Sequence, residues 1–138
     1  PIFRILSGGY LTVTTSQDRA LNGLVGQRVN LLQVNPYGDK SAGNYLNPVA
    51  FAMPALGTLG NHGAASIAGP GMWQFDAALT RTFQVREMQR LEFRAEAFNV
   101  TNSVSLNDPV TNFNAGNYGQ VTSARDPRIM QFALKYFF

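Results

Sequence analysis

The most regularly spaced reactive side chains in the sequence are four charges of alternating sign that occupy every second position of one short segment. If this segment is a strand, its alternate side chains point to the same side, so the four charges share one face. That face must be hydrated or paired, because an unpaired charge that faces lipid near the centre of a bilayer costs about 2 to 4 kcal/mol. We therefore expect a polar structural wall, paired across a sheet, rather than a path for ions. The four charges are Arg90, Glu92, Arg94 and Glu96, and the residues expected to complete the pairing from neighbouring strands are Asp76, Arg81 and Lys135.

Side chains suited to catalysis or metal binding are few and isolated. The single histidine, His62, lies in a glycine-rich stretch, and the chain has no cysteine, so neither a metal site nor a nucleophile with a histidine base has partners nearby. We expect His62 to be a loop residue. Three loop aspartates lack the spacing of a calcium loop and are expected to form Asx turns: Asp39, Asp108 and Asp126. The sequence therefore predicts no enzyme, no cofactor and no metal site.

The composition is typical of a protein with much of its surface out of water. Charged residues make up 14% of the 138-residue chain, against about 25% in typical soluble domains, whereas hydrophobic residues make up 45%. No apolar run approaches the roughly 20 residues of a membrane-spanning helix, and the mean hydropathy is only -0.10. A transmembrane barrel has this profile because half of each strand faces a polar interior. The net charge of +3 is scattered rather than gathered in a basic patch, so we expect no nucleic-acid partner.

Four segments alternate apolar and polar residues with a period of two. Each is at least as long as the roughly 9 to 11 residues of a tilted membrane strand, whereas soluble strands average about 5 to 6 residues. Helix is rejected for the third segment, because apolar residues at every second position would spread around a helix. The predicted fold is all-β, an antiparallel sheet of about four long strands that forms part of an outer-membrane-type β-barrel. The predicted strands are 2–15, 72–84, 89–99 and 128–138, and Gly8 and Gly9 are expected to bend the first of them.

The last segment has an apolar face that includes the final residue of the sequence. A terminal aromatic residue, with apolar or aromatic residues at every second position before it, resembles the C-terminal strand that outer-membrane barrels present to their insertion machinery. The residues of this expected barrel-terminal signal are Met130, Phe132, Leu134, Tyr136 and Phe138. Aromatic residues near the predicted strand ends are expected to form interfacial girdles: Trp73, Tyr136, Phe137 and Phe138.

The connections between the predicted strands differ sharply in length. Residues 85–88 form a tight turn, whereas residues 16–71 and 100–127 form two long loops rich in Gly, Asn and Pro. Outer-membrane barrels have short periplasmic turns and longer extracellular loops. With the last strand ending in the periplasm, strand parity predicts that the turn is periplasmic and that both long loops lie outside the cell.

A series of motifs along nearly the whole chain is similar to the C-terminal end of TonB-dependent receptors, in the order in which that family has them. The closest kind is the Oar-like subgroup of acidobacterial type, whose large receptors carry a carboxypeptidase-regulatory-like domain at the N-terminus. The resemblance implies a barrel of 22 strands with a plug and an energy-transducing inner-membrane partner, of which this chain would hold the last four long strands. The motifs are Leu46-Asn-Pro-Val-Ala-Phe51, Gly57-Thr-Leu-Gly-Asn61, Gly69-Pro-Gly71, Trp73-Gln-Phe-Asp76, Arg90-Leu-Glu-Phe-Arg-Ala-Glu-Ala-Phe-Asn99, Asn117-Tyr-Gly-Gln120, Ser123-Ala-Arg-Asp-Pro-Arg128 and Gln131-Phe-Ala-Leu-Lys135.

Four strands are too few to close a barrel, since the smallest single-chain examples have about eight. Closure therefore requires the remainder of a parent barrel or further copies, joined through the strand edges. Because the sequence begins at Pro1 without an initiator methionine, we expect it to be a piece of a longer or processed protein.

Three alternative functions follow from these observations. The first is a receptor segment in the bacterial outer membrane, in contact with its lipid and not transport-competent by itself. The others are an extracellular tube or filament that assembles from copies of the segment, and a soluble β-sandwich binding module.

Overall fold

A computed structural model describes residues 1–138, which divide into two packed units. The first unit comprises Pro1–Leu6, Met72–Ser105 and Arg125–Phe138, and the second comprises Ser7–Gly71 and Leu106–Ala124. All regular elements are strands except η1, a single turn of 3₁₀ helix at Pro48–Ala50. The structure contains no helix that is both long and apolar enough to cross a membrane.

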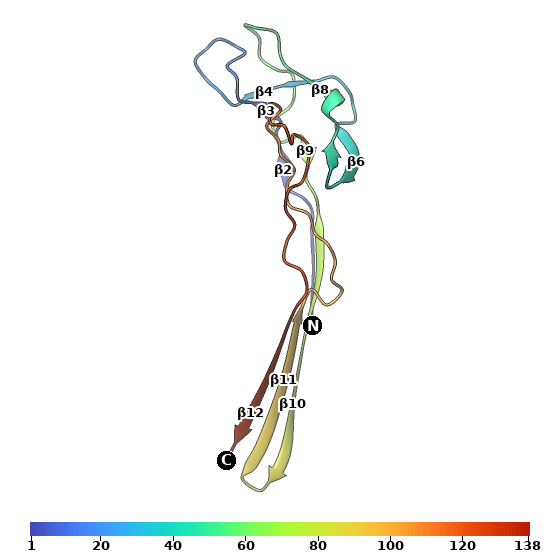
Figure 1. Ribbon diagram of the computed structural model, residues 1–138, viewed down its shortest axis with the longest axis vertical. Coiled ribbons are helices and arrows are strands. Elements are labelled where there is room, and N and C mark those ends of the chain that lie inside the picture. Colours follow the sequence, from blue (N-terminus) through green and yellow to red (C-terminus); the bar gives the residue numbers. More distant parts are fainter. The chain divides into compact units, whose positions relative to one another are not determined.

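The first unit is one open antiparallel sheet with the strand order β1-β10-β11-β12 (Figure 1). Its outer strands, β1 and β12, each pair on one side only. The predicted all-β class and the open antiparallel sheet are thereby confirmed. Alternation of apolar and polar residues is what keeps Gln89–Phe98 extended despite its good helix formers. The strands are β1 (Ile2–Leu6), β10 (Met72–Arg86), β11 (Gln89–Phe98) and β12 (Ile129–Phe137).

The structure differs from the predicted first strand, 2–15, which is divided among three short strands. β1 ends at Leu6, and β2 (Tyr10–Leu11) and β3 (Thr14–Thr15) belong to the second unit. The physical reason is a close backbone approach at Gly8, where a Cβ atom would lie 1.9 Å from the carbonyl oxygen of Gly69. β2 pairs there with β9 (Ile67–Ala68), so the chain changes its partner strand instead of continuing the long sheet.

The two predicted long loops supply most of the second unit, which has a hydrophobic core of its own. Its short strands pair as β2-β9, β3-β4, β5-β8 and β6-β7. Phe51 lies at the centre of the aromatic packing, with its ring centroid 6.0 Å from that of Tyr118 in an edge-to-face arrangement. The core residues are Val13, Val29, Tyr45, Leu46, Ala50, Phe51, Ile67, Tyr118 and Val121. The remaining strands are β4 (Gln27–Arg28), β5 (Asn30–Leu31), β6 (Tyr37–Ser41), β7 (Asn44–Leu46) and β8 (Phe51–Ala52).

Candidate functional site

The candidate functional site is the pair of faces of the four-stranded sheet. Residues that lie directly opposite each other in an antiparallel ladder share a face, so the register assigns every side chain. One face, named the apolar face, is formed almost entirely by large apolar and small residues, most of them exposed within the unit. It comprises Phe3 and Ile5 of β1, Trp73, Phe75, Ala77, Leu79, Arg81 and Phe83 of β10, Leu91, Phe93, Ala95 and Ala97 of β11, and Met130, Phe132, Leu134 and Tyr136 of β12.

Four residues of the expected barrel-terminal signal, Met130, Phe132, Leu134 and Tyr136, lie on this apolar face. Phe132 stacks beside Phe93 with 6.4 Å between ring centroids, and Leu134 lies opposite Phe93 in the register. Phe138 follows β12 and is 95% exposed, with its ring 6.1 Å from that of Tyr136. At the other end of the strands, Trp73 packs beside Phe3 of β1 with 6.2 Å between ring centroids. Aromatic rings thus occur near both ends of the apolar face. The expectation that Phe137 belongs to these girdles is wrong, because the register places it opposite Arg90 on the polar face.

Arg81 is the single charged residue on the apolar face. It lies opposite Phe93 in the register, and its guanidinium carbon lies 5.2 Å from the ring centroid of Phe83. The expectation that Arg81 completes the charge pairing of the polar wall is therefore wrong, because its position in the strand alternation turns it to the opposite face. A long stem on apolar surface with the charge near an aromatic ring is the arrangement by which arginine reaches an interface from a lipid-facing position.

The opposite face, named the polar face, carries the charge ladder Arg90, Glu92, Arg94 and Glu96. Arg94 forms an ion pair with Glu96 two residues further along the same strand, and its Nε donates to Glu96 Oε1 at 2.9 Å. Arg90 packs over Phe137 of β12, with 4.6 Å between the guanidinium carbon and the ring centroid. Lys135 lies opposite Glu92 in the register but forms no ion pair with it. The ladder thus contains one close ion pair, and its two arginines are exposed.

Asp76 is the most highly connected charged residue on the polar face. Its carboxylate accepts hydrogen bonds from Arg4 Nη2 at 2.7 Å, Gln74 Nε2 at 2.7 Å and the backbone N–H of Asn99 at 2.9 Å. The Asp76 side chain is only 10% exposed, so these three donors replace most of its hydration. The carboxylate thereby joins β1, β10 and the end of β11, instead of extending the charge ladder.

Asn99 and Arg4 are structural residues that the sequence reasoning did not single out. Asn99 has a positive φ of 51°, and its side chain bonds the backbone of Ser103 in both directions, Oδ1 accepting from the N–H and Nδ2 donating to the carbonyl, each at 3.0 Å. An Asn directly after Phe98, the last apolar residue of β11, is a sequence signal for such a turn, because Asn tolerates the left-handed region of backbone conformation. Arg4 carried no such sign, because its partner is 72 positions away.

His62 lies outside the regular strands, as expected, but it is a core residue of the second unit with 1% exposure. Its Nδ1 lies 3.3 Å from Ser66 Oγ, whereas Nε2 has no hydrogen-bond partner. The imidazole packs edge-to-face against Phe51 with 5.6 Å between centroids. Burial, assisted by the positive charge of Arg28, lowers the pKa of His62 below its ordinary value.

The second unit is therefore expected to lose stability in mild acid. The unfolded chain binds a proton at His62 near pH 6.5 and the folded unit binds it only at lower pH, so the stabilisation is complete above pH 6.5 and falls as the pH drops below it. The backbone N–H of His62 donates a hydrogen bond to Val29 O at 3.0 Å and reports on opening of the unit. Its hydrogen exchange, corrected for intrinsic rates, should be faster at pH 5.5 than at pH 7.5. These two pH values lie about one unit below and above the ordinary histidine pKa. A His62→Phe variant should show no such pH dependence. Equal behaviour of the two proteins would contradict the prediction.

The three loop aspartates have separate surroundings. Asp39 forms the expected Asx turn, accepting the N–H of Ser41 at 2.9 Å, and this hydrogen bond lowers the pKa of its carboxyl. The Asp108 carboxylate lies beside Gly69, 2.8 Å from where a Cβ of that residue would be, and its neighbourhood contains no cluster of metal-binding side chains. Asp126 is exposed, and its backbone carbonyl oxygen accepts a hydrogen bond from Asn99 Nδ2 at 3.5 Å.

An open sheet of long strands, with one exposed apolar face and one charged face, is the pattern expected of a transmembrane β-barrel wall, in which closure with further strands satisfies the sheet edges. The chain belongs to the outer membrane beta barrel domain family, whose family model matches residues 1–131. Comparisons with curated proteins and with solved structures gave no match. In the walls of such barrels the face toward lipid is apolar and the face toward the interior is polar.

Proposed function

We propose that this chain is the C-terminal wall segment of a TonB-dependent outer-membrane receptor of the Oar-like type. The observation that carries the proposal is the division of the sheet into a continuous apolar face and a face with the four-charge ladder. The order of the sequence motifs supports the receptor subgroup. The segment acts as part of the barrel wall, with the remainder of the barrel and outer-membrane lipid as its partners. It catalyses no reaction and transports nothing by itself.

The connections of the sheet give the proposed orientation. Only Glu87 and Met88 join β10 to β11, whereas residues 7–71 join β1 to β10 and residues 99–128 join β11 to β12. In outer-membrane barrels the short turns are periplasmic and the long connections are extracellular. The second unit, built mainly from those long connections, is therefore proposed to lie on the cell surface.

Cysteine labelling tests this orientation, because the chain has no cysteine of its own. Val34 and Met88 are both strongly exposed, so each accepts a cysteine without loss of packing. A maleimide too bulky to pass porins should label Val34→Cys in intact cells, and should label Met88→Cys only after the outer membrane is permeabilised. Labelling of Met88→Cys alone in intact cells would reverse the orientation, and labelling of both would contradict membrane insertion.

The receptor function itself is tested by comparing nutrient depletion from the medium by three strains. The strains are the parent, a strain without the receptor that contains this segment, and a strain without the inner-membrane energy transducer. The same compound should remain in the medium of both deletion strains. The transducer-deficient strain will fail to take up certain compounds. If the receptor-deficient strain takes up every one of these compounds at the parental rate, the proposal is contradicted.

A second candidate is favoured by the unpaired edges of β1 and β12. Edge strands with free backbone N–H and C=O groups pair readily with further strands, so identical copies are able to close or extend the sheet into a tube or filament. Intact mass and electron microscopy of detergent-free material distinguish the two functions. Regular tubes of a 15.1 kDa chain would establish the assembly, whereas a much longer chain that is extracted only by detergent would establish the receptor.

A further inference from the structure

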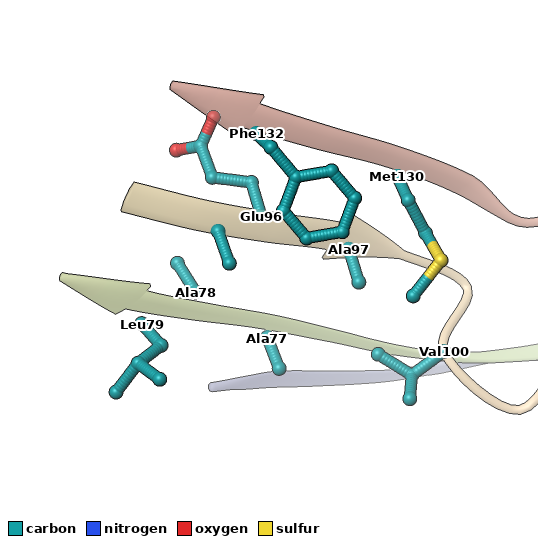
Figure 2. A pocket seen from close by; sticks show the side chains of 9 residues that line it. Ala77, Ala78, Leu79, Glu96, Ala97, Val100, Met130 and Phe132 are labelled. Carbon is teal, nitrogen blue, oxygen red and sulfur yellow. The ribbon is translucent and has the colours of Figure 1, made fainter. Parts of the chain in front are cut away.

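The second unit exposes apolar side chains that neither its own core nor the four-stranded sheet accounts for. The sheet has a shallow hollow of about 220 Å³ across β10, β11 and β12, lined by Ala77, Ala97 and Phe132 among others (Figure 2), but this hollow is part of the apolar face already described. In the second unit, by contrast, exposed aliphatic residues lie on two irregular loops. One loop connects β3 to β4 and the other follows β8 (Figure 1).

Two polar side chains, Asp18 and Gln27, hold the first loop in a defined shape. The Asp18 carboxylate accepts the backbone N–H groups of Asn22 at 3.1 Å and Gly23 at 2.7 Å, and it accepts Gln27 Nε2 at 2.8 Å. Gln27 Oε1 in turn accepts the N–H of Arg19 at 2.9 Å. Because its backbone is fixed by these hydrogen bonds, the loop loses little conformational entropy when a partner packs on it.

The apolar side chains of this loop are exposed rather than packed into the core. Leu21, Leu24 and Val25 each leave most of their surface free. Leu21 also has a positive φ of 57°, which is an uncommon backbone conformation for a bulky side chain. Such strain persists only where the surrounding structure holds it, and it is concentrated at functional sites. The hydrogen bonds of Asp18 and Gln27 supply that support here.

The second loop is joined to the first through Arg19. Arg19 Nε donates to the carbonyl oxygen of Pro54 at 2.8 Å, and the carbonyl oxygen of Arg19 accepts the N–H of Gly57 at 2.7 Å. Leu56 and Leu59, on either side of Gly57, are thereby held near the first loop. The exposed residues of the two loops are named the aliphatic loop surface, and each is at least 64% exposed: Leu21, Leu24, Val25, Leu56 and Leu59.

The composition of these loops favours a permanent partner. Residues 18–27 and 54–60 contain no aromatic residue, and their only charges, Asp18 and Arg19, take part in the hydrogen bonds that shape the loops. The residues that anchor contacts between separate proteins are most often Trp, Tyr and Arg, whereas Leu and Val are under-represented. Obligate interfaces are more hydrophobic and resemble a domain core cut in half.

Packing of this kind already occurs within the second unit. Tyr118 and Val121 come from the connection between β11 and β12, and they complete the core around Phe51, which comes from the connection between β1 and β10. Long connections that follow different strands of the sheet are thus held together by apolar side chains. A further connection would extend the same interface over the aliphatic loop surface.

We propose that the aliphatic loop surface is covered by another long connection of the same barrel, which joins strands outside residues 1–138. The inference rests on the proposed function, because it requires a complete barrel whose other long connections lie on the same side of the membrane. It adds a specific partner to that function. The partner is an apolar, uncharged segment of the same polypeptide, which fixes the second unit within the layer of surface connections.

Cysteine reactivity in the full receptor tests this packing. Leu24→Cys and Leu56→Cys should react with a bulky maleimide in intact cells at least about tenfold more slowly than Val34→Cys, because a packed side chain reacts only when its surroundings open. Val34 is the matched control, since it is an exposed aliphatic residue of the same unit that lies outside the two loops. If Leu24→Cys does not assemble, Leu56→Cys decides. Equal rates for the variants would overturn the inference.

Photo-leucine, which replaces leucine with little change of shape, identifies the occupant in the otherwise native receptor. Cross-links from Leu21, Leu24 or Leu56 should reach peptides outside residues 1–138 within the monomer band of a gel. A cross-link to a second copy, another protein or a lipid would overturn the inference and leave the barrel-wall function unaffected. Failure of Val34→Cys to react in intact cells would instead overturn the cell-surface placement, and the inference with it.

Discussion

Asp76→Ala is expected to lower the free energy of unfolding of the barrel by about 2 kcal/mol, within the usual cost of leaving a buried hydrogen-bond donor without its acceptor. The substitution leaves the Asn99 N–H without its acceptor and removes the partner of Arg4, at a side chain that is only 10% exposed. Because the carboxylate joins β1, β10 and the end of β11, both the sheet edge and the turn after β11 should loosen. The measurement is the urea midpoint of the purified receptor in detergent, followed by its heat-modifiable mobility on gels.

Asp126→Ala provides the control for this experiment. Asp126 is an exposed aspartate of the same unit, and its side chain forms neither an ion pair nor a hydrogen bond. Its removal should change the stability by less than about 0.5 kcal/mol, as for most surface substitutions. Asp76→Asn should fall between the two, since it keeps one acceptor oxygen and loses the charge. Equal midpoints for Asp76→Ala and Asp126→Ala would show that the Asp76 hydrogen bonds contribute nothing to stability.

Leu134→Arg is expected to destabilise the inserted barrel by about 2 to 4 kcal/mol, the cost of an arginine that faces lipid near the bilayer centre. Leu134 lies near the middle of β12 on the apolar face, opposite Phe93, and is 66% exposed. The unfolding free energy in phospholipid vesicles measures the effect. The same substitution should cost far less in detergent micelles, where water reaches the charge more easily.

Gln131→Arg is the matched control, because it adds the same side chain to the same strand on the opposite face. Gln131 is exposed and lies opposite Glu96, so the new charge gains a partner across the strands. Its stability in vesicles should stay within about 0.5 kcal/mol of the native value. If both substitutions cost the same, the assignment of the two faces to lipid and interior would be refuted.

The sequence by itself determined the long strands β10, β11 and β12 and the division of their side chains between two faces. The reason is that side-chain alternation in a strand is a local property with a period of two, so it is readable without knowledge of any partner strand. The charge ladder and the four expected barrel-terminal residues within β12 therefore lie on opposite faces of the observed sheet. The same alternation places Arg81 on the apolar face. The prediction that Arg81 pairs with the charge ladder considered its charge but not its position in this alternation.

Only the tertiary structure decided which distant residues meet. The Arg4 to Asp76 ion pair, the end of β1 at Leu6 and the burial of His62 each depend on contacts between segments far apart in the chain. Such contacts form where the shapes of several segments fit together, and no periodic pattern in one segment encodes them. For this reason the long connections, which have no regular alternation, were expected to be loops, whereas they pack around Phe51 and Tyr118 into a unit with its own core.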